Sequence, residues 1–103
     1  MTNFVVEIVQ TGCGGSIVYR EGENHIDFGW EFANPPAMAL VFGPSARLMD
    51  KKYPWATGRC EVIYNAVGTE VVRQKVEGGS YTVDLEGGII HVLSTSDYSS
   101  EQF

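Results

Sequence analysis

Long apolar runs are missing from this chain of 103 residues. None approaches the roughly 20 residues that a membrane-spanning helix needs. Residues 1–7 contain no basic side chain, and Glu7 interrupts their apolar run, so they lack the pattern of a secretory signal. We therefore expect a cytoplasmic protein without membrane attachment, although a secreted chain whose signal had been removed would look the same.

Cysteine and basic residues are also scarce. The two cysteines, Cys13 and Cys60, are too few for a disulfide framework, and we expect free thiols in a reducing compartment. Seven Lys and Arg side chains against 13 Asp and Glu give a net charge of −6. Because affinity for phosphate backbones comes from clustered basic side chains, nucleic acid is not an expected partner. The negative charge favours a basic protein surface or a cationic small molecule.

The strongest pattern that the chain does contain lies in residues 25–32, which alternate as a strand with one buried face. The apolar face carries Ile26, Phe28, Trp30 and Phe32, and the polar face carries His25, Asp27, Gly29 and Glu31. Each buried aromatic side chain removes about 150 to 250 Å² from water. We therefore expect this strand to nucleate the core.

Seven further strands are predicted from β-branched and aromatic runs bounded by Gly, Pro and Asn: residues 4–9, 16–20, 37–42, 60–67, 69–76, 80–85 and 89–93. One short helix is predicted at residues 45–52, with Ser45 as its N-cap. Eight short strands with at most one short helix are typical of a mainly β, antiparallel sandwich or small barrel. We expect a single domain over residues 1–93 and a flexible tail over residues 94–103.

This arrangement predicts a set of mostly buried residues: Ile26, Phe28, Trp30, Phe32, Leu40, Phe42, Val62, Tyr64 and Val83.

The polar face of the strand over residues 25–32 is one candidate site. Alternate residues of a strand lie about 6.6 to 7 Å apart, so His25, Asp27 and Glu31 could converge on one ligand. No further His or Cys follows nearby in the chain to complete a zinc set, so we predict no metal site. An ordinary solvated strand face is the favoured interpretation.

The loop over residues 53–55 is the other candidate surface. Tyr53 and Trp55 flank a proline, and aromatic side chains in an irregular loop are favoured as interface anchors or as platforms for a flat ligand. They could equally plug one end of a small core. Cys13, within a glycine-rich turn, and His91, among apolar residues, are interpreted as structural rather than catalytic.

Two classes of function remain. We favour a small, acidic, non-enzymatic binding or interaction module, because no nucleophile, base and orienting group can be named together. The alternative is a small-molecule site in a β-barrel, with or without catalysis, for a cationic or aromatic ligand. Trp30 or Trp55 would line that site, and Glu31 or Asp27 would orient the ligand. No cofactor is expected for either class.

Sheet edges favour a homodimer as the form of interaction. The predicted strands 4–9 and 37–42 contain no Lys or Arg side chain that would keep an exposed edge from pairing. A closed barrel would remove the edges. Otherwise a second subunit would cover an edge or the loop over residues 53–55, most simply as a two-fold dimer.

Overall fold

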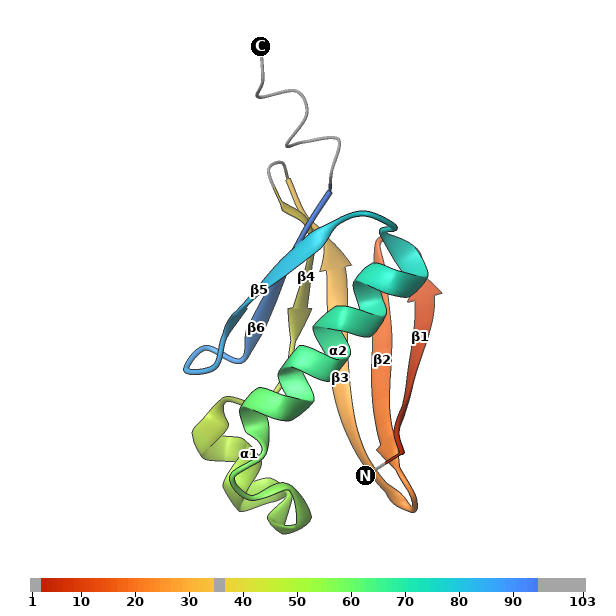
Figure 1. Ribbon diagram of the computed structural model, residues 1–103. Helices are drawn as coiled ribbons and strands as arrows, with labels where there is room; N and C mark the ends of the chain where they lie inside the picture. Colours follow the sequence, from red (N-terminus) through yellow and green to blue (C-terminus); the bar gives the residue numbers. More distant parts are fainter. Residues whose placement is uncertain (1–2, 35–36, 95–103) are drawn as a thin grey trace.

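Six antiparallel strands form one open sheet in the computed structural model, which describes residues 3–34 and 37–94 (Figure 1). The strands are β1 (Val5–Thr11), β2 (Gly14–Glu21), β3 (Asn24–Phe32), β4 (Ala37–Phe42), β5 (Ser80–Asp84) and β6 (Ile89–Leu93). Their order across the sheet is β1-β2-β3-β4-β6-β5, so β1 and β5 are the edge strands. The first four strands form a meander, and the last hairpin adds beside β4.

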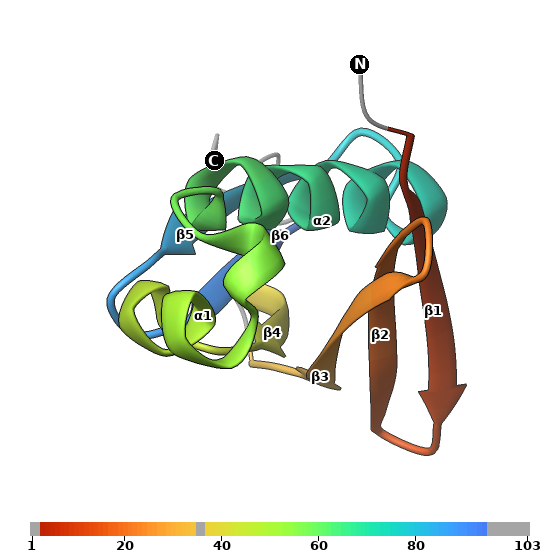
Figure 2. The ribbon, with the colours of Figure 1, turned by 90° about the horizontal axis from the view of Figure 1, so that it is seen from below.

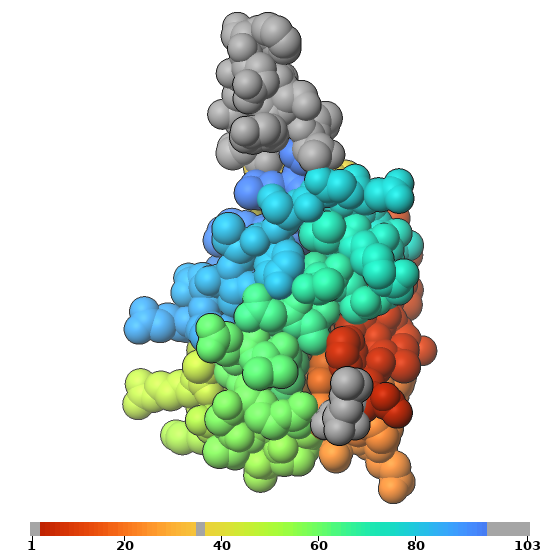
Figure 3. Space-filling view, in the orientation of Figure 1, coloured from red at the N-terminus to blue at the C-terminus, as the bar shows by residue number. Residues whose placement is uncertain are grey.

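Helices fill the connection between β4 and β5. They are α1 (Ala46–Lys52), the short 3-10 helix η1 (Pro54–Ala56) and α2 (Cys60–Lys75). The long helix α2 crosses one face of the sheet, and the sheet curves around it (Figure 2). In the space-filling view the segment from α1 to α2 forms a continuous surface over this side (Figure 3). We call this side the covered face and the opposite side the open face.

The core lies between α2 and the covered face. The buried side chains of α2 follow a helical spacing through Cys60, Ile63, Tyr64, Val67 and Val71. They pack against buried strand residues that include Ile17, Tyr19, Ile26, Phe28, Val41, Ile90 and Val92. Burial of this apolar surface is the main force that holds the helix on the sheet.

The mainly β class is confirmed, but the eight strands and the closed barrel or sandwich are wrong. Residues 60–67 and 69–76 were predicted as two strands, whereas α2 occupies this region as one helix. Valine and isoleucine favour strands locally, and Gly68 resembles a turn between them. Gly68 instead lets Tyr81 pack on α2, because a Cβ at this position would come within 2.6 Å of the tyrosine ring. Contact with the sheet overrides the local preference of these residues.

The alternation predicted for residues 25–32 is confirmed over its first part, since Ile26 and Phe28 are buried and His25 and Asp27 are exposed. Of the other residues expected in the core, Tyr64 is buried, and Trp30, Leu40 and Val83 are half-buried.

Burial was predicted wrongly for three side chains: Phe32, Phe42 and Val62 are 48%, 38% and 62% exposed. Phe32 ends β3, Phe42 lies on the open face, and Val62 lies on the outer side of α2.

The predicted short helix is confirmed as α1, where the Ser45 side chain accepts a hydrogen bond from the Leu48 backbone N–H at 3.3 Å. No helix in residues 3–34 and 37–94 is long and apolar enough to cross a bilayer. Of the predicted tail, Ser94 is the last described residue, and residues 95–103 lie outside the described part of the chain. The single-domain organisation stays a prediction.

Candidate functional site

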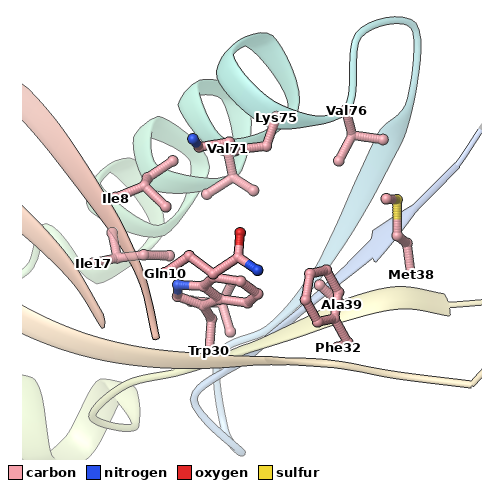
Figure 4. A pocket seen from close by; sticks show the side chains of 11 residues that line it. Ile8, Gln10, Ile17, Trp30, Phe32, Met38, Ala39, Val71, Lys75 and Val76 are labelled. Carbon is pink, nitrogen blue, oxygen red and sulfur yellow. The ribbon is translucent and has the colours of Figure 1, made fainter. Parts of the chain in front are cut away.

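An apolar pocket lies between the C-terminal half of α2 and the covered face of the sheet (Figure 4). Its volume is about 230 Å³. Trp30 and Val41 line it from the central strands, Ile8 and Ile17 from β1 and β2, and Val71 from α2. The pocket therefore depends on side chains that lie far apart in the sequence and meet only through the sheet and the helix.

Trp30 reaches its place in the pocket by crossing over β2. Gly15 is its partner in the β2–β3 register, and the indole Nε1–H donates to the Val9 carbonyl oxygen on β1 at 3.1 Å. A Cβ at Gly15 would meet that oxygen and would lie 2.9 Å from Nε1. Glycine therefore provides the space for the indole. Because the indole N–H is already paired, the ring offers an apolar surface to a ligand.

Two apolar side chains at the mouth remain accessible. The Phe32 ring packs edge-on against Trp30, with ring centroids 5.1 Å apart and an interplanar angle of 89°. Met38 is 36% exposed and falls in the β4–β6 irregularity between Ala37 and Ala39, where the extra residue turns toward the pocket. Both add apolar, partly exposed surface to the lining of the pocket.

The polar groups of the pocket are an amide and a cation. Gln10 donates from Nε2 to the Gly12 carbonyl oxygen at 3.2 Å, and its side-chain oxygen is a further acceptor. Lys75 makes neither an ion pair nor a hydrogen bond with any residue in the described part of the chain. The described lining contains no Asp or Glu. Lys75 is exposed, so it adds a positive charge at the edge of the pocket, in a chain whose net charge is −6.

The predicted polar residues of β3 lie on the open face, away from this pocket. His25 Nε2 and Asp27 Oδ2 are 3.7 Å apart, and both side chains are more than half exposed. Glu31 is on the same face, about 13 Å further along the strand. Trp30 points to the covered face, so the structure does not bring Trp30 together with either carboxylate. Across residues 3–34 and 37–94, no three His, Cys, Asp or Glu side chains group as a metal site.

Tyr53 and Trp55 lie at the other end of the molecule from the pocket mouth, between α1 and α2. Their rings are 6.4 Å apart in an edge-on arrangement, and both side chains are half-buried against the core. The Arg59 guanidinium lies 6.0 Å from the centre of the Trp55 ring. This geometry favours the interpretation of the loop as a plug of the core.

Ionic hydrogen bonds connect the start of α2 to β2 at this end of the molecule. Arg59 donates to both carboxylate oxygens of Glu21, at 2.8 and 2.6 Å, and Tyr19 donates its hydroxyl to the same carboxylate at 2.6 Å. Arg59 holds the pKa of Glu21 below its usual value. Burial, reinforced by the Glu21 carboxylate, raises the pKa of Tyr19 to about 12. The network is a structural tie between the sheet and the start of α2.

The cysteines and His91 take separate places. Cys13 is exposed in the β1–β2 turn, and its carbonyl oxygen accepts from the Phe32 backbone N–H at 3.0 Å. Cys60 is buried, and desolvation raises the pKa of its thiol. His91 is half-buried on β6, between Leu40 and Thr82. No hydrogen bond within the described residues joins a cysteine to a histidine.

Sequence reasoning missed most of the pocket. Lys75 and Val71 were assigned to a strand, so their place above Trp30 could not be inferred. The spacing of three or four residues from Cys60 through Ile63 and Val67 was the available signal for a helix, because only a helix places these residues on one face.

Relatives add no information about this site. Comparisons of the chain with protein-family models, with curated proteins and with solved structures give no match. A function for the chain must therefore be inferred from its own pocket and surfaces.

Proposed function

We propose that this chain is a non-enzymatic binding domain whose site is the pocket between α2 and the covered face. The observation that carries the proposal is the combination of an apolar pocket of about 230 Å³ with Lys75, an exposed lysine of its lining that has no ion pair or hydrogen bond to another described residue. Ligand sites are typically apolar cavities in which a few polar groups fix orientation. Lys75 and the Gln10 amide supply such groups here.

The ligand class follows from the size and charge of the pocket. Pockets for drug-sized ligands span about 300 to 1,000 Å³, so this one suits a compact molecule of one or two rings. Trp30 and Phe32 favour an aromatic ring, and Lys75 favours a carboxylate or another acidic group on that ring. A cationic ligand, suggested by the net charge of the chain, would meet Lys75 instead of a carboxylate.

Binding without catalysis is supported by the chemistry of the lining. The described residues around the pocket include neither a hydroxyl or thiol nucleophile nor a His, Asp or Glu that could act as a base. The lysine is the one ionisable side chain among them. Such a lining can hold and orient a molecule.

Calorimetric titration with three probes of the same ring system tests the proposal: naphthoate, neutral naphthamide and cationic naphthylmethylammonium. Naphthoate has about 13 non-hydrogen atoms. A binding free energy of about 0.4 kcal/mol per atom then corresponds to a Kd near 0.1 mM. We expect naphthoate to bind about fivefold more tightly than naphthamide, the effect of about 1 kcal/mol from a partly exposed ion pair. The cationic probe should bind most weakly.

Three variants test whether naphthoate binds in this pocket and contacts Lys75. Lys75→Met keeps the length of the side chain but removes its charge, so it should reduce naphthoate binding to the level of naphthamide and leave naphthamide unchanged. Ala39→Leu fills the pocket and should weaken both probes. Lys51→Met, on exposed α1, is the matched charge control and should change neither. Preference for the cationic probe, or binding that none of these variants alters, would contradict the proposal.

A further inference from the structure

The amide of Gln10 has a defined orientation in the lining of the pocket. Gln10 lies near the end of β1, and its Nε2 donates to the carbonyl oxygen of Gly12, in the turn that follows, at 3.2 Å. A carbonyl oxygen can only accept a hydrogen bond, so this contact determines which side of the amide carries the nitrogen. The side-chain oxygen, Oε1, therefore lies on the other side of the amide.

The Oε1 atom is available to a ligand. Figure 4 shows that it is turned toward α2, on the side of Val71. Within residues 3–34 and 37–94 it accepts no hydrogen bond. Gln10 is exposed, so water can donate to this oxygen when no ligand is bound. A donor group on a ligand would take the place of that water.

The other polar groups of the lining cannot accept a hydrogen bond in this way. The indole N–H of Trp30 is already bonded to the Val9 carbonyl oxygen, and an indole offers no acceptor. The ammonium group of Lys75 has three donors and no acceptor, and the sulfur of Met38 is a weak acceptor. Oε1 of Gln10 is therefore the one strong side-chain acceptor in the described lining.

We propose that the ligand of the pocket is an aromatic acid that also carries an O–H or N–H donor on its ring, and that Gln10 Oε1 selects for this donor. The inference rests on the proposed function and narrows its ligand class. Lys75 on α2 donates to the carboxylate, and Gln10 on β1 accepts from the ring substituent. Two polar contacts from different elements orient the ring within an otherwise apolar site.

The gain in affinity from this donor is modest, because Oε1 is exposed to water. The ligand exchanges its own water for the amide oxygen, and a neutral hydrogen bond of this kind changes Kd by about threefold to tenfold. A methoxy group gains nothing from Oε1, since two acceptors cannot pair. A hydroxyl group and its methyl ether at the same ring position therefore distinguish the two cases.

Calorimetric titration of the full chain near neutral pH tests the inference. The probes are naphthoate, two hydroxynaphthoate isomers whose hydroxyl group lies on the ring distant from the carboxylate, and the methyl ether of each isomer. A phenolic hydroxyl has a pKa of about 10 and stays protonated under these conditions. At least one hydroxynaphthoate should bind about threefold to tenfold more tightly than naphthoate, and its methyl ether should bind no more tightly than naphthoate.

Two glutamine variants show whether Gln10 causes this hydroxyl preference, the ratio of the Kd of naphthoate to that of the hydroxynaphthoate. Gln10→Met keeps the length of the side chain but removes the amide, so the ratio should fall to about one. Gln74→Met is the matched control, because Gln74 is exposed on α2, bonds to the Val6 carbonyl oxygen and is not part of the described lining. The ratio in Gln74→Met should equal that of the parent.

The outcomes separate this inference from the proposed function. Naphthoate binding without a preference for either hydroxynaphthoate would overturn the inference and leave the proposed function standing. Methyl ethers that bind as tightly as the hydroxynaphthoates would also overturn it, as would a preference that persists in Gln10→Met or is lost equally in Gln74→Met. Binding of none of the probes, naphthoate included, would overturn the proposed function and this inference with it.

Discussion

Replacing Gly15 by alanine tests whether glycine holds Trp30 in the pocket. The new methyl group would meet the Val9 carbonyl oxygen and would lie 2.9 Å from the indole Nε1. The Trp30–Val9 hydrogen bond of 3.1 Å occupies that space, so it must break or β1 must move. We therefore expect Gly15→Ala to disturb the position of the indole over β2, either directly or through a shift of β1.

The expected change in the free energy of unfolding of Gly15→Ala combines two destabilising effects and one stabilising effect. Overpacking a site of this kind costs about 1 to 3 kcal/mol. Loss of one hydrogen bond adds about 0.5 to 1.5 kcal/mol. Lower backbone entropy of the unfolded chain returns up to about 1 kcal/mol. The free energy of unfolding should fall by about 2 kcal/mol, which for a domain of this size lowers the melting temperature by roughly 10 °C.

Thermal unfolding at about 1 µM protein, a concentration low enough to limit any self-association, measures this cost. Gly29→Ala is the matched control, since its Cβ would enter open space, and its melting temperature should equal or slightly exceed that of the parent. Naphthoate binding should weaken at least tenfold in Gly15→Ala and stay unchanged in Gly29→Ala. A Gly15→Ala protein that melts and binds like the parent would refute the role given to this glycine.

Three further predictions concern stability and thiol chemistry. Arg59 lowers the pKa of Glu21 in the folded protein. We therefore expect the free energy of unfolding at neutral pH to be about 1 to 3 kcal/mol higher for wild type than for Glu21→Gln. That difference should be complete above about pH 4.3, the ordinary value for glutamate, and should disappear as the pH falls through the lower pKa of the folded protein. Denaturant unfolding at several pH values measures it, and a difference that persists at pH 2 would contradict it. Phe28→Ala should cost about 3 to 5 kcal/mol in the same assay, because Phe28 is buried, and an unchanged midpoint would contradict its place in the core. A thiol reagent should label exposed Cys13 at an ordinary rate and buried Cys60 slowly. Rapid labelling of Cys13 at mildly acidic pH would show a depressed pKa and would reopen the possibility of catalysis.

The parts of the fold that sequence reasoning predicted are those set by local patterns. Alternation over residues 25–32 placed β3 in the correct register, and the bounds of β4 and β6 were predicted from flanking Pro and Gly. Ser45 identified the start of α1, because an N-cap is a feature of adjacent residues. Each of these signals lies within one short segment.

The helix α2 and the pocket depend on contacts between distant segments. Val67 and Val71 have strand-forming side chains, and they are helical because α2 covers the apolar face of the sheet. Lys75 lines the pocket because α2 places it there. Trp30 lines the pocket because Gly15, its partner on β2, leaves space for the indole. Such relations require the sheet order, which local patterns do not contain. The predicted meeting of Trp30 with Asp27 or Glu31 failed because neighbours in a strand point to opposite faces.

Indole N–H signals in a nuclear magnetic resonance titration test most directly whether a compact aromatic acid occupies the pocket beside Trp30, as proposed. The chain has two tryptophans, of which Trp30 lines the pocket and Trp55 packs between α1 and α2. Adding naphthoate should shift the Trp30 indole signal progressively and leave that of Trp55 in place, with the same midpoint as the calorimetric titration. Lys75→Met should move that midpoint to higher concentration. A shift of the Trp55 signal alone, or of neither signal at ten times the expected Kd of about 0.1 mM, would contradict the account.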